Sequence, residues 1–119
     1  MADLKLGAIE TRFAEIIWEN EPMTTANLVK LCAKVLQWKR TTTYTVLKKL
    51  SEKGIFKTEN SVVTSLISKQ EFEAMQSEQF VEENFKGSLP AFLAAFGSRK
   101  KLTDKEIDEM KMLIEKMRG

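Results

Sequence analysis

The sequence predicts a mainly α-helical fold that contains one small β-hairpin. Three observations lead to this prediction. Apolar residues recur at steps of three and four along the first half of the chain, two short β-prone segments follow, and two capping-box patterns open further helices beyond them. The 119 residues are 43% hydrophobic and 30% charged, which is typical of a folded chain and not of a disordered one.

Three helices are expected in the first half of the chain. The first covers about residues 7–19 and ends before Pro22, because proline lacks a backbone donor and restricts the residue before it. The second begins at a cap formed by Thr24 or Thr25, and the third covers about residues 40–53, directly before Gly54. The inward-facing residues of the three helices are, in chain order, Ile9, Phe13, Ile16 and Ile17; Leu28, Leu31, Cys32 and Val35; and Thr43, Val46, Leu47 and Leu50.

A β-hairpin is expected directly after the third helix. Residues 55–58 and 62–66 are rich in β-prone side chains, and the residues between them have the composition of a turn. Three closely connected helices followed by such a hairpin, or wing, have the layout of a winged helix-turn-helix domain. We therefore predict this domain over residues 1–67 and a helical dimerisation region over residues 68–119.

The second region is expected to pair with a second copy of the chain. Ser68 and Thr103 open capping boxes, a short apolar helix covers residues 89–96, and residues 97–101 have the composition of a linker. Short isolated helices are marginal in water, so pairing is favoured, with packing onto the N-terminal domain as the alternative. The residues expected at the dimer interface are Phe72, Met75, Phe80, Phe85, Leu89, Phe92, Leu93, Phe96, Ile107, Met110, Leu113 and Ile114.

The composition argues against several kinds of site. With one cysteine, Cys32, and no histidine, the chain lacks the groups for an intrachain disulfide or for Ser-His or Cys-His catalysis. We expect no metal site, no cofactor and no enzymatic activity, because no polar cluster has the spacing of such a site. The longest apolar run, residues 91–96, is too short to span a bilayer, so we expect no membrane insertion and a cytoplasmic protein.

Positive charge is concentrated around the third helix. Residues 30–57 hold eight basic residues and one acidic residue, whereas the net charge of the whole chain is +2. A helical wheel places Thr41, Thr45, Lys48 and Glu52 on the outward face, flanked by Thr42, Tyr44 and Lys49. Hydroxyls and lysines on one face suit the bases and phosphates of a DNA major groove. The alternatives are a merely solvated helix face and a winged-helix module that binds protein without specific DNA binding.

Three motifs give the chain a family resemblance. They are Leu6-Gly7-x-x-Glu10-x-x-Phe13-x-x-x-Ile17-Trp18; Trp38-x-x-x-Thr42-x-x-Thr45-x-Leu47-x-Lys49-Leu50-x-x-Lys53-Gly54; and Ile67-Ser68-x-x-Glu71-Phe72, with Phe80 and Phe85-x-Gly87-Ser88-Leu89 after it. In this order and spacing they resemble the penicillinase-repressor (BlaI/MecI) family of winged helix-turn-helix transcriptional repressors. The match runs over nearly the whole chain.

The resemblance implies a homodimer that binds double-stranded operator DNA, a near-palindrome of the TACA/TGTA type, and blocks transcription. The wheel and the resemblance together assign base reading to Thr41, Thr42 and Thr45. They assign phosphate binding to Lys39, Arg40, Tyr44, Lys48, Lys49 and Lys57.

Two departures from the family pattern concern the wing and the cleavage site of the relatives. The family's wing carries a Gly-Arg-x-x-x-Tyr run, whereas the hairpin here is shorter and has only Lys57 as a base, which leaves wing contact with DNA open. Relatives controlled by β-lactams are cut by a partner protease at an Asn-Phe bond. The corresponding pair here is Ala95 and Phe96, which leaves open whether a membrane sensor protease relieves repression.

Overall fold

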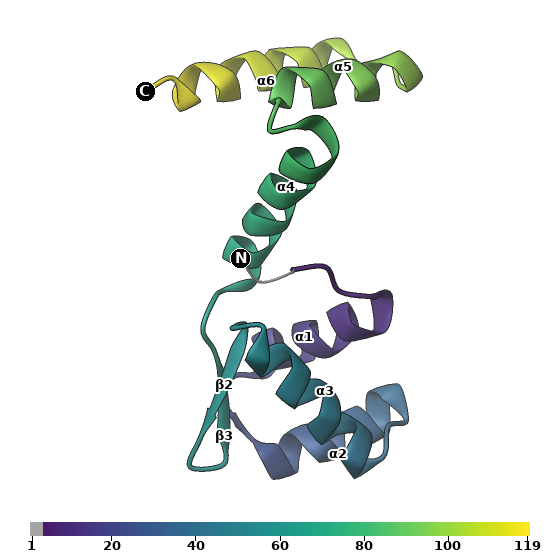
Figure 1. Ribbon diagram of the computed structural model, residues 1–119, viewed down its shortest axis with the longest axis vertical. Coiled ribbons are helices and arrows are strands. Elements are labelled where there is room, and N and C mark those ends of the chain that lie inside the picture. Colours follow the sequence, from purple (N-terminus) through teal and green to yellow (C-terminus); the bar gives the residue numbers. More distant parts are fainter. Residues whose placement is uncertain (1–3) are drawn as a thin grey trace. The chain divides into compact units, whose positions relative to one another are not determined.

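The computed structural model describes residues 4–119. In chain order they form α1 (Ala8–Asn20), β1 (Met23–Thr24), α2 (Thr25–Leu36), α3 (Arg40–Glu52), β2 (Phe56–Glu59), β3 (Val62–Ser65), α4 (Lys69–Phe85), α5 (Leu89–Arg99) and α6 (Asp104–Met117) (Figure 1). This confirms the predicted class, a mainly helical chain with a small sheet. The chain divides into one compact unit that ends at Gln79 and a second that starts at Phe80, so the division falls within α4.

One hydrophobic core holds the N-terminal unit together. Its fully buried side chains come from α1, α2, α3, the sheet and the segment before it: Phe13, Ile17, Leu28, Cys32, Thr43, Leu50, Ile55, Phe56 and Val63. Phe13 of α1 stacks on Trp38, which lies in the short connection before α3, with ring centroids 5.4 Å apart. The start of α3 is therefore fixed against α1, and the predicted helix-turn-helix core is present.

The sheet has one strand more than the sequence predicted. Its order is β1-β3-β2, with antiparallel pairing throughout. The hairpin closes through Asn60 and Ser61, which both have positive φ, as a tight two-residue hairpin turn requires. Strand β1 was not predicted because a strand of two residues has no detectable alternation of polar and apolar side chains.

Side-chain hydrogen bonds attach the hairpin to the end of α1. The carboxylate of Glu21 accepts from the backbone N–H of Ser65 at 2.9 Å and from the Ser65 hydroxyl at 2.7 and 2.8 Å. The indole Nε1 of Trp18 donates to the carbonyl oxygen of Ile67 at 3.1 Å. These bonds attach the last residue of β3, Ser65, and the nearby residue Ile67 to the C-terminal end of α1.

Two residues expected to face inward are exposed instead, so those two predictions were wrong. Ile9 lies in the first turn of α1 and Val35 in the last turn of α2. Each lies three or four residues from a buried residue of the same helix, as a core position would. Each is also at the end of its helix, where no other part of the core that the structure describes packs against it. The remaining inward residues are buried or half-buried, as predicted.

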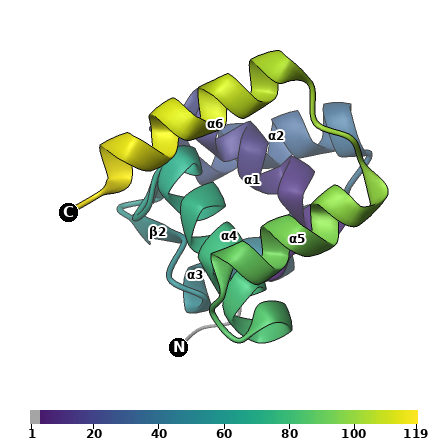
Figure 2. The same ribbon diagram turned by 90° about the horizontal axis from the view of Figure 1, so that it is seen from above.

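Two helices, α5 and α6, follow the end of α4 in the C-terminal unit (Figure 2). The hydroxyls of Ser88 and Thr103 cap them, and Thr103 forms the predicted capping box with Glu106. The linker expected at residues 97–101 was partly wrong, because α5 continues to Arg99. A glycine inside a helix costs about 1 kcal/mol, which is too little to end α5 at Gly97.

Aromatic side chains provide the internal packing of the C-terminal unit. The rings of Phe80, Phe85 and Phe92 form a triangle with centroid distances of 5.5 to 6.1 Å. No residue of α5 or α6 is buried within the chain. Among the described residues, no helix has the length and apolar character needed to cross a membrane.

Candidate nucleic-acid interface

Buried residues on one side of α3 determine which of its side chains face solvent. Thr43, Leu47 and Leu50 are buried, and the Thr43 hydroxyl donates to the carbonyl oxygen of Lys39 at 3.3 Å. The side chains left exposed on the opposite side are Thr41, Thr42, Thr45, Lys48, Lys49 and Glu52. The structure thus brings the predicted base-reading threonines together on one exposed face.

The three threonines of this face offer both hydrogen-bond donors and acceptors. The Thr45 hydroxyl donates to the carbonyl oxygen of Thr41 at 2.9 Å, so its own oxygen remains free to accept. The hydroxyls of Thr41 and Thr42 form no bond with any described residue. The threonine methyl groups add small apolar surfaces of the kind that contacts the methyl group of thymine.

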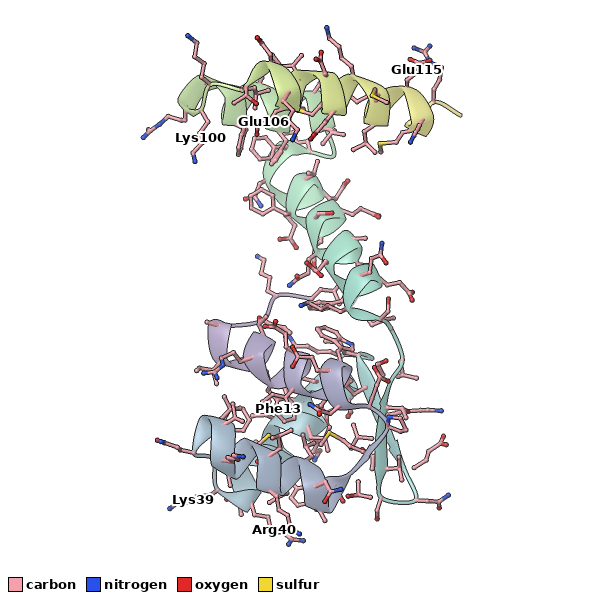
Figure 3. All side chains as sticks on the ribbon, turned by 180° about the vertical axis from the view of Figure 1, so that it is seen from behind. Phe13, Lys39, Arg40, Lys100, Glu106 and Glu115 are labelled. Atoms are coloured by element: carbon pink, nitrogen blue, oxygen red, sulfur yellow. The ribbon has the colours of Figure 1, made fainter. Side chains whose placement is uncertain are left out.

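The N-terminal end of α3 is electropositive. It has no acidic residue in its first turn and no side-chain cap, so its first backbone N–H groups add to the charge of Lys39 and Arg40. Arg40 lies over the half-buried ring of Tyr44, with its guanidinium carbon 5.4 Å from the ring centroid. Figure 3 shows Lys39 and Arg40 projecting into solvent from the N-terminal unit, away from Phe13 in the core. Such a helix end favours an anion, and DNA phosphates are anions.

The predicted phosphate-binding residues differ in their ion pairing. Lys39 and Lys48 form no ion pair with any residue between 4 and 119. The Lys49 ammonium instead lies 2.8 Å from a carboxylate oxygen of Glu10 in α1. On the wing, the Lys57 ammonium lies 3.5 Å from the Glu59 carboxylate. The negative charge of Glu59 therefore offsets the positive charge of Lys57.

Glu10 is a residue of this surface that the sequence analysis did not assign to the site. It belongs to the first family motif, but nothing in the sequence indicated that its carboxylate reaches α3. The hydrogen bond from Lys49 is the main cause that lowers the pKa of Glu10, and the bond from the Gly7 N–H lowers it further. Glu10 therefore carries its negative charge at neutral pH.

The residues predicted for dimerisation fall into three groups, which are buried, exposed and half-buried in the single chain. Phe72 is only 2% exposed and packs against Trp18 with ring centroids 5.5 Å apart, so it belongs to the core of the N-terminal unit. The exposed residues of the predicted set are Met75, Phe80, Leu89, Leu93, Phe96, Leu113 and Ile114. The half-buried ones are Phe85, Phe92, Ile107 and Met110.

Two more apolar residues of α6 are exposed beyond those predicted. They are Met112 and Met117, at 66% and 67% exposure. Met117 continues the three-and-four spacing of Leu113 and Ile114, so the sequence contained its signal, whereas Met112 lies off that stripe. In α5, Ala95 and Phe96 lie inside the helix with exposed side chains.

Comparison with known proteins gives two matches to nearly the whole chain. The penicillinase repressor family matches residues 6–116. The methicillin resistance regulatory protein MecI of Staphylococcus aureus is 22% identical over 116 residues, which cover 94% of each chain. The family match includes all of α3, α4 and α5, and all of α6 except its last residue.

Proposed function

The chain belongs to the penicillinase repressor family, a family of transcriptional repressors, and we propose that it acts as a homodimer on a near-palindromic operator of the TACA/TGTA type. In this proposal the bound dimer blocks transcription at the promoter that contains the operator. The observation that carries the proposal is the exposed face of α3, where threonine hydroxyls lie beside Lys39 and Lys48, which form no ion pair with any residue between 4 and 119.

The recognition helix would be α3, and its two ends would have different tasks. Thr41, Thr42 and Thr45 would contact base edges in the major groove, because short hydroxyl side chains allow the helix to approach closely. Phosphate binding would fall to the cations near the start of the helix and to Lys48, with Tyr44 supporting Arg40. Phosphate contacts of this kind fix the register of a protein on DNA without reading sequence.

The homodimer part of the proposal is supported by the apolar residues of α5 and α6. These two helices have no buried residue in the single chain, yet α6 exposes four large apolar side chains: Met112, Leu113, Ile114 and Met117. Covering one half-exposed side chain of this size contributes about 1 kcal/mol, roughly half the value for full burial. A second copy of α5 and α6 would supply the matching apolar surface, and the symmetry of the dimer would match that of the operator.

Relief of repression by proteolysis is a further part of the proposal. Cleavage between Ala95 and Phe96 by a membrane sensor protease would separate α6 from the DNA-binding domain and so remove part of the dimer interface. Exposure of both side chains favours access, although a protease would first have to unwind this part of α5. Mass spectrometry of the chain recovered from β-lactam-treated cells would then detect a fragment that ends at Ala95. An intact chain in cells with full derepression would contradict this part.

Fluorescence anisotropy with two labelled duplexes tests the proposed DNA binding. The account predicts that a TACA/TGTA palindrome binds at least about 10³-fold more tightly than a scrambled duplex, at two chains per duplex. Equal and steeply salt-dependent binding would mean that the cations contact phosphates without any base reading. Absence of binding to both duplexes at low salt would favour a protein-interaction module instead.

A further inference from the structure

The carboxylate of Glu10 links the first turn of α1 to the last turns of α3. One of its oxygens accepts from the Gly7 N–H at 3.1 Å, and the other lies 2.8 Å from the ammonium of Lys49. The Glu10 side chain is 21% exposed and the Lys49 side chain 56% exposed, so the pair lies at the surface with Glu10 on its inner side. Directly after the end of α3, the Lys53 ammonium donates to the carbonyl oxygen of Lys5 at 3.0 Å.

This pairing changes the charge that the C-terminal half of α3 presents to a polyanion. Lys48 is exposed and forms no ion pair with a described residue, so its full charge is available. Lys49, its neighbour, is compensated by the Glu10 carboxylate, and the hydrogen bonds from Lys49 itself and from the Gly7 N–H lower the pKa of that carboxylate and so keep it charged. A phosphate approaching Lys49 would have to share the ammonium with that fixed negative charge.

We propose that Glu10 sets the DNA affinity of this domain by competing with phosphate for Lys49. The inference rests on the proposed DNA-binding function and deepens it. Glu10 acts through Lys49 and touches no DNA, so it is a positioning residue that removes one cation from the phosphate-binding set. Its effect is the same on operator and on unrelated DNA, because Lys49 lies outside the base-reading threonines.

The substitution Glu10→Gln tests this proposal without removing the helix cap. Glutamine at this position still accepts from the Gly7 N–H, as in a normal capping box, but carries no charge that competes with phosphate. Glu15→Gln is the matched control on the same helix. It removes the same charge and releases Lys69, now paired with Glu15 at 3.3 Å, which lies outside the α3 face.

The measurement is the slope of log Kd against log salt concentration for the palindrome and for the scrambled duplex. Glu10→Gln is expected to steepen the slope by about 1.8, which is about 0.9 for each of the two Lys49 side chains of the dimer, and to tighten binding to both duplexes by about 60-fold at 0.1 M salt, because each added phosphate contact releases counterions. The Glu15→Gln variant should keep the wild-type slope. Combining Lys49→Met with Glu10→Gln should cancel this gain.

The outcomes separate this inference from the proposed function. If the wild type binds neither duplex, the DNA-binding function and this inference both fail. If the wild type binds DNA but Glu10→Gln keeps its slope or weakens binding, the inference alone is overturned. A steeper slope that persists when Lys49→Met is added to Glu10→Gln would also overturn it, because the added phosphate contact would then not come from Lys49.

Discussion

Replacing Thr45 with alanine should reduce sequence discrimination without weakening the fold. The side chain is exposed, and its hydroxyl donates only to the carbonyl oxygen of Thr41, which already lies in a helix. Alanine is also the better helix former by up to about 0.7 kcal/mol. We therefore expect the stability of Thr45→Ala in urea to equal or slightly exceed that of the wild type.

The expected loss of discrimination follows from the number of contacts. A bidentate base contact is worth about 1–3 kcal/mol, so a single hydroxyl or methyl contact falls near the lower end, about 1 kcal/mol. A dimer makes this contact in both half-sites, which gives about 2 kcal/mol, or roughly 30-fold in the affinity ratio of palindrome to scrambled duplex.

Anisotropy titrations of the wild type, Thr45→Ala and Thr45→Val on both duplexes provide the assay. Valine keeps a methyl group and removes the hydroxyl, so it distinguishes contact with a thymine methyl from hydrogen bonding to a base. The affinity of Thr45→Ala for the scrambled duplex should stay within about 2-fold of the wild type, since phosphate contacts are unchanged. Equal losses on both duplexes would refute the assignment of Thr45 to base reading.

Three further predictions concern the core, the dimer and the pH dependence of stability. Phe13→Ala should reduce the free energy of unfolding by about 3–5 kcal/mol, because it empties a fully buried position that packs against Trp38; urea unfolding that changes by less than about 1 kcal/mol would contradict this. Ile114→Asp should shift dimers towards monomers in sedimentation velocity while the helical content stays unchanged, and a dimer that persists at micromolar concentration would exclude the exposed α6 face as the interface. The pKa of Glu10 in the folded protein is lowered from 4.5. The stability that ionised Glu10 adds to the folded state is therefore complete above pH 4.5, and it is lost as the pH falls through the pKa of Glu10 in the folded protein. The difference in melting temperature between wild type and Glu10→Gln should therefore shrink from pH 7 to pH 3, and a constant difference would show that ionised Glu10 adds no stability.

The sequence predicted those features that depend on local periodicity and capping. The face of α3 that carries Thr41 and Thr45 could be predicted because Leu47 and Leu50 mark the opposite, buried side at helical spacing. Likewise, the Thr103 capping box depends on residues three positions apart, so it needs no knowledge of the tertiary structure.

The features that were missed depend on tertiary contacts. The pairing of Glu10 with Lys49 joins residues of two helices, and nothing in their local sequence sets the distance between them. Phe72 has the same apolar character as the residues of the second unit, and only the packing of α4 on Trp18 assigns it to the first. Strand β1 forms because the chain after α1 passes beside β3, which a two-residue pattern cannot indicate.

The most direct test of the central claim is the dependence of operator affinity on the spacing between half-sites. Two α3 helices held by one dimer should fit half-sites about one helical turn apart, and an insertion of 5 base pairs places them on opposite faces of the duplex. We expect one optimal spacing and a loss of at least about 100-fold for the 5-base-pair insertion, towards the affinity for scrambled DNA. Equal affinity at every spacing would contradict a dimer that reads its operator through two α3 helices.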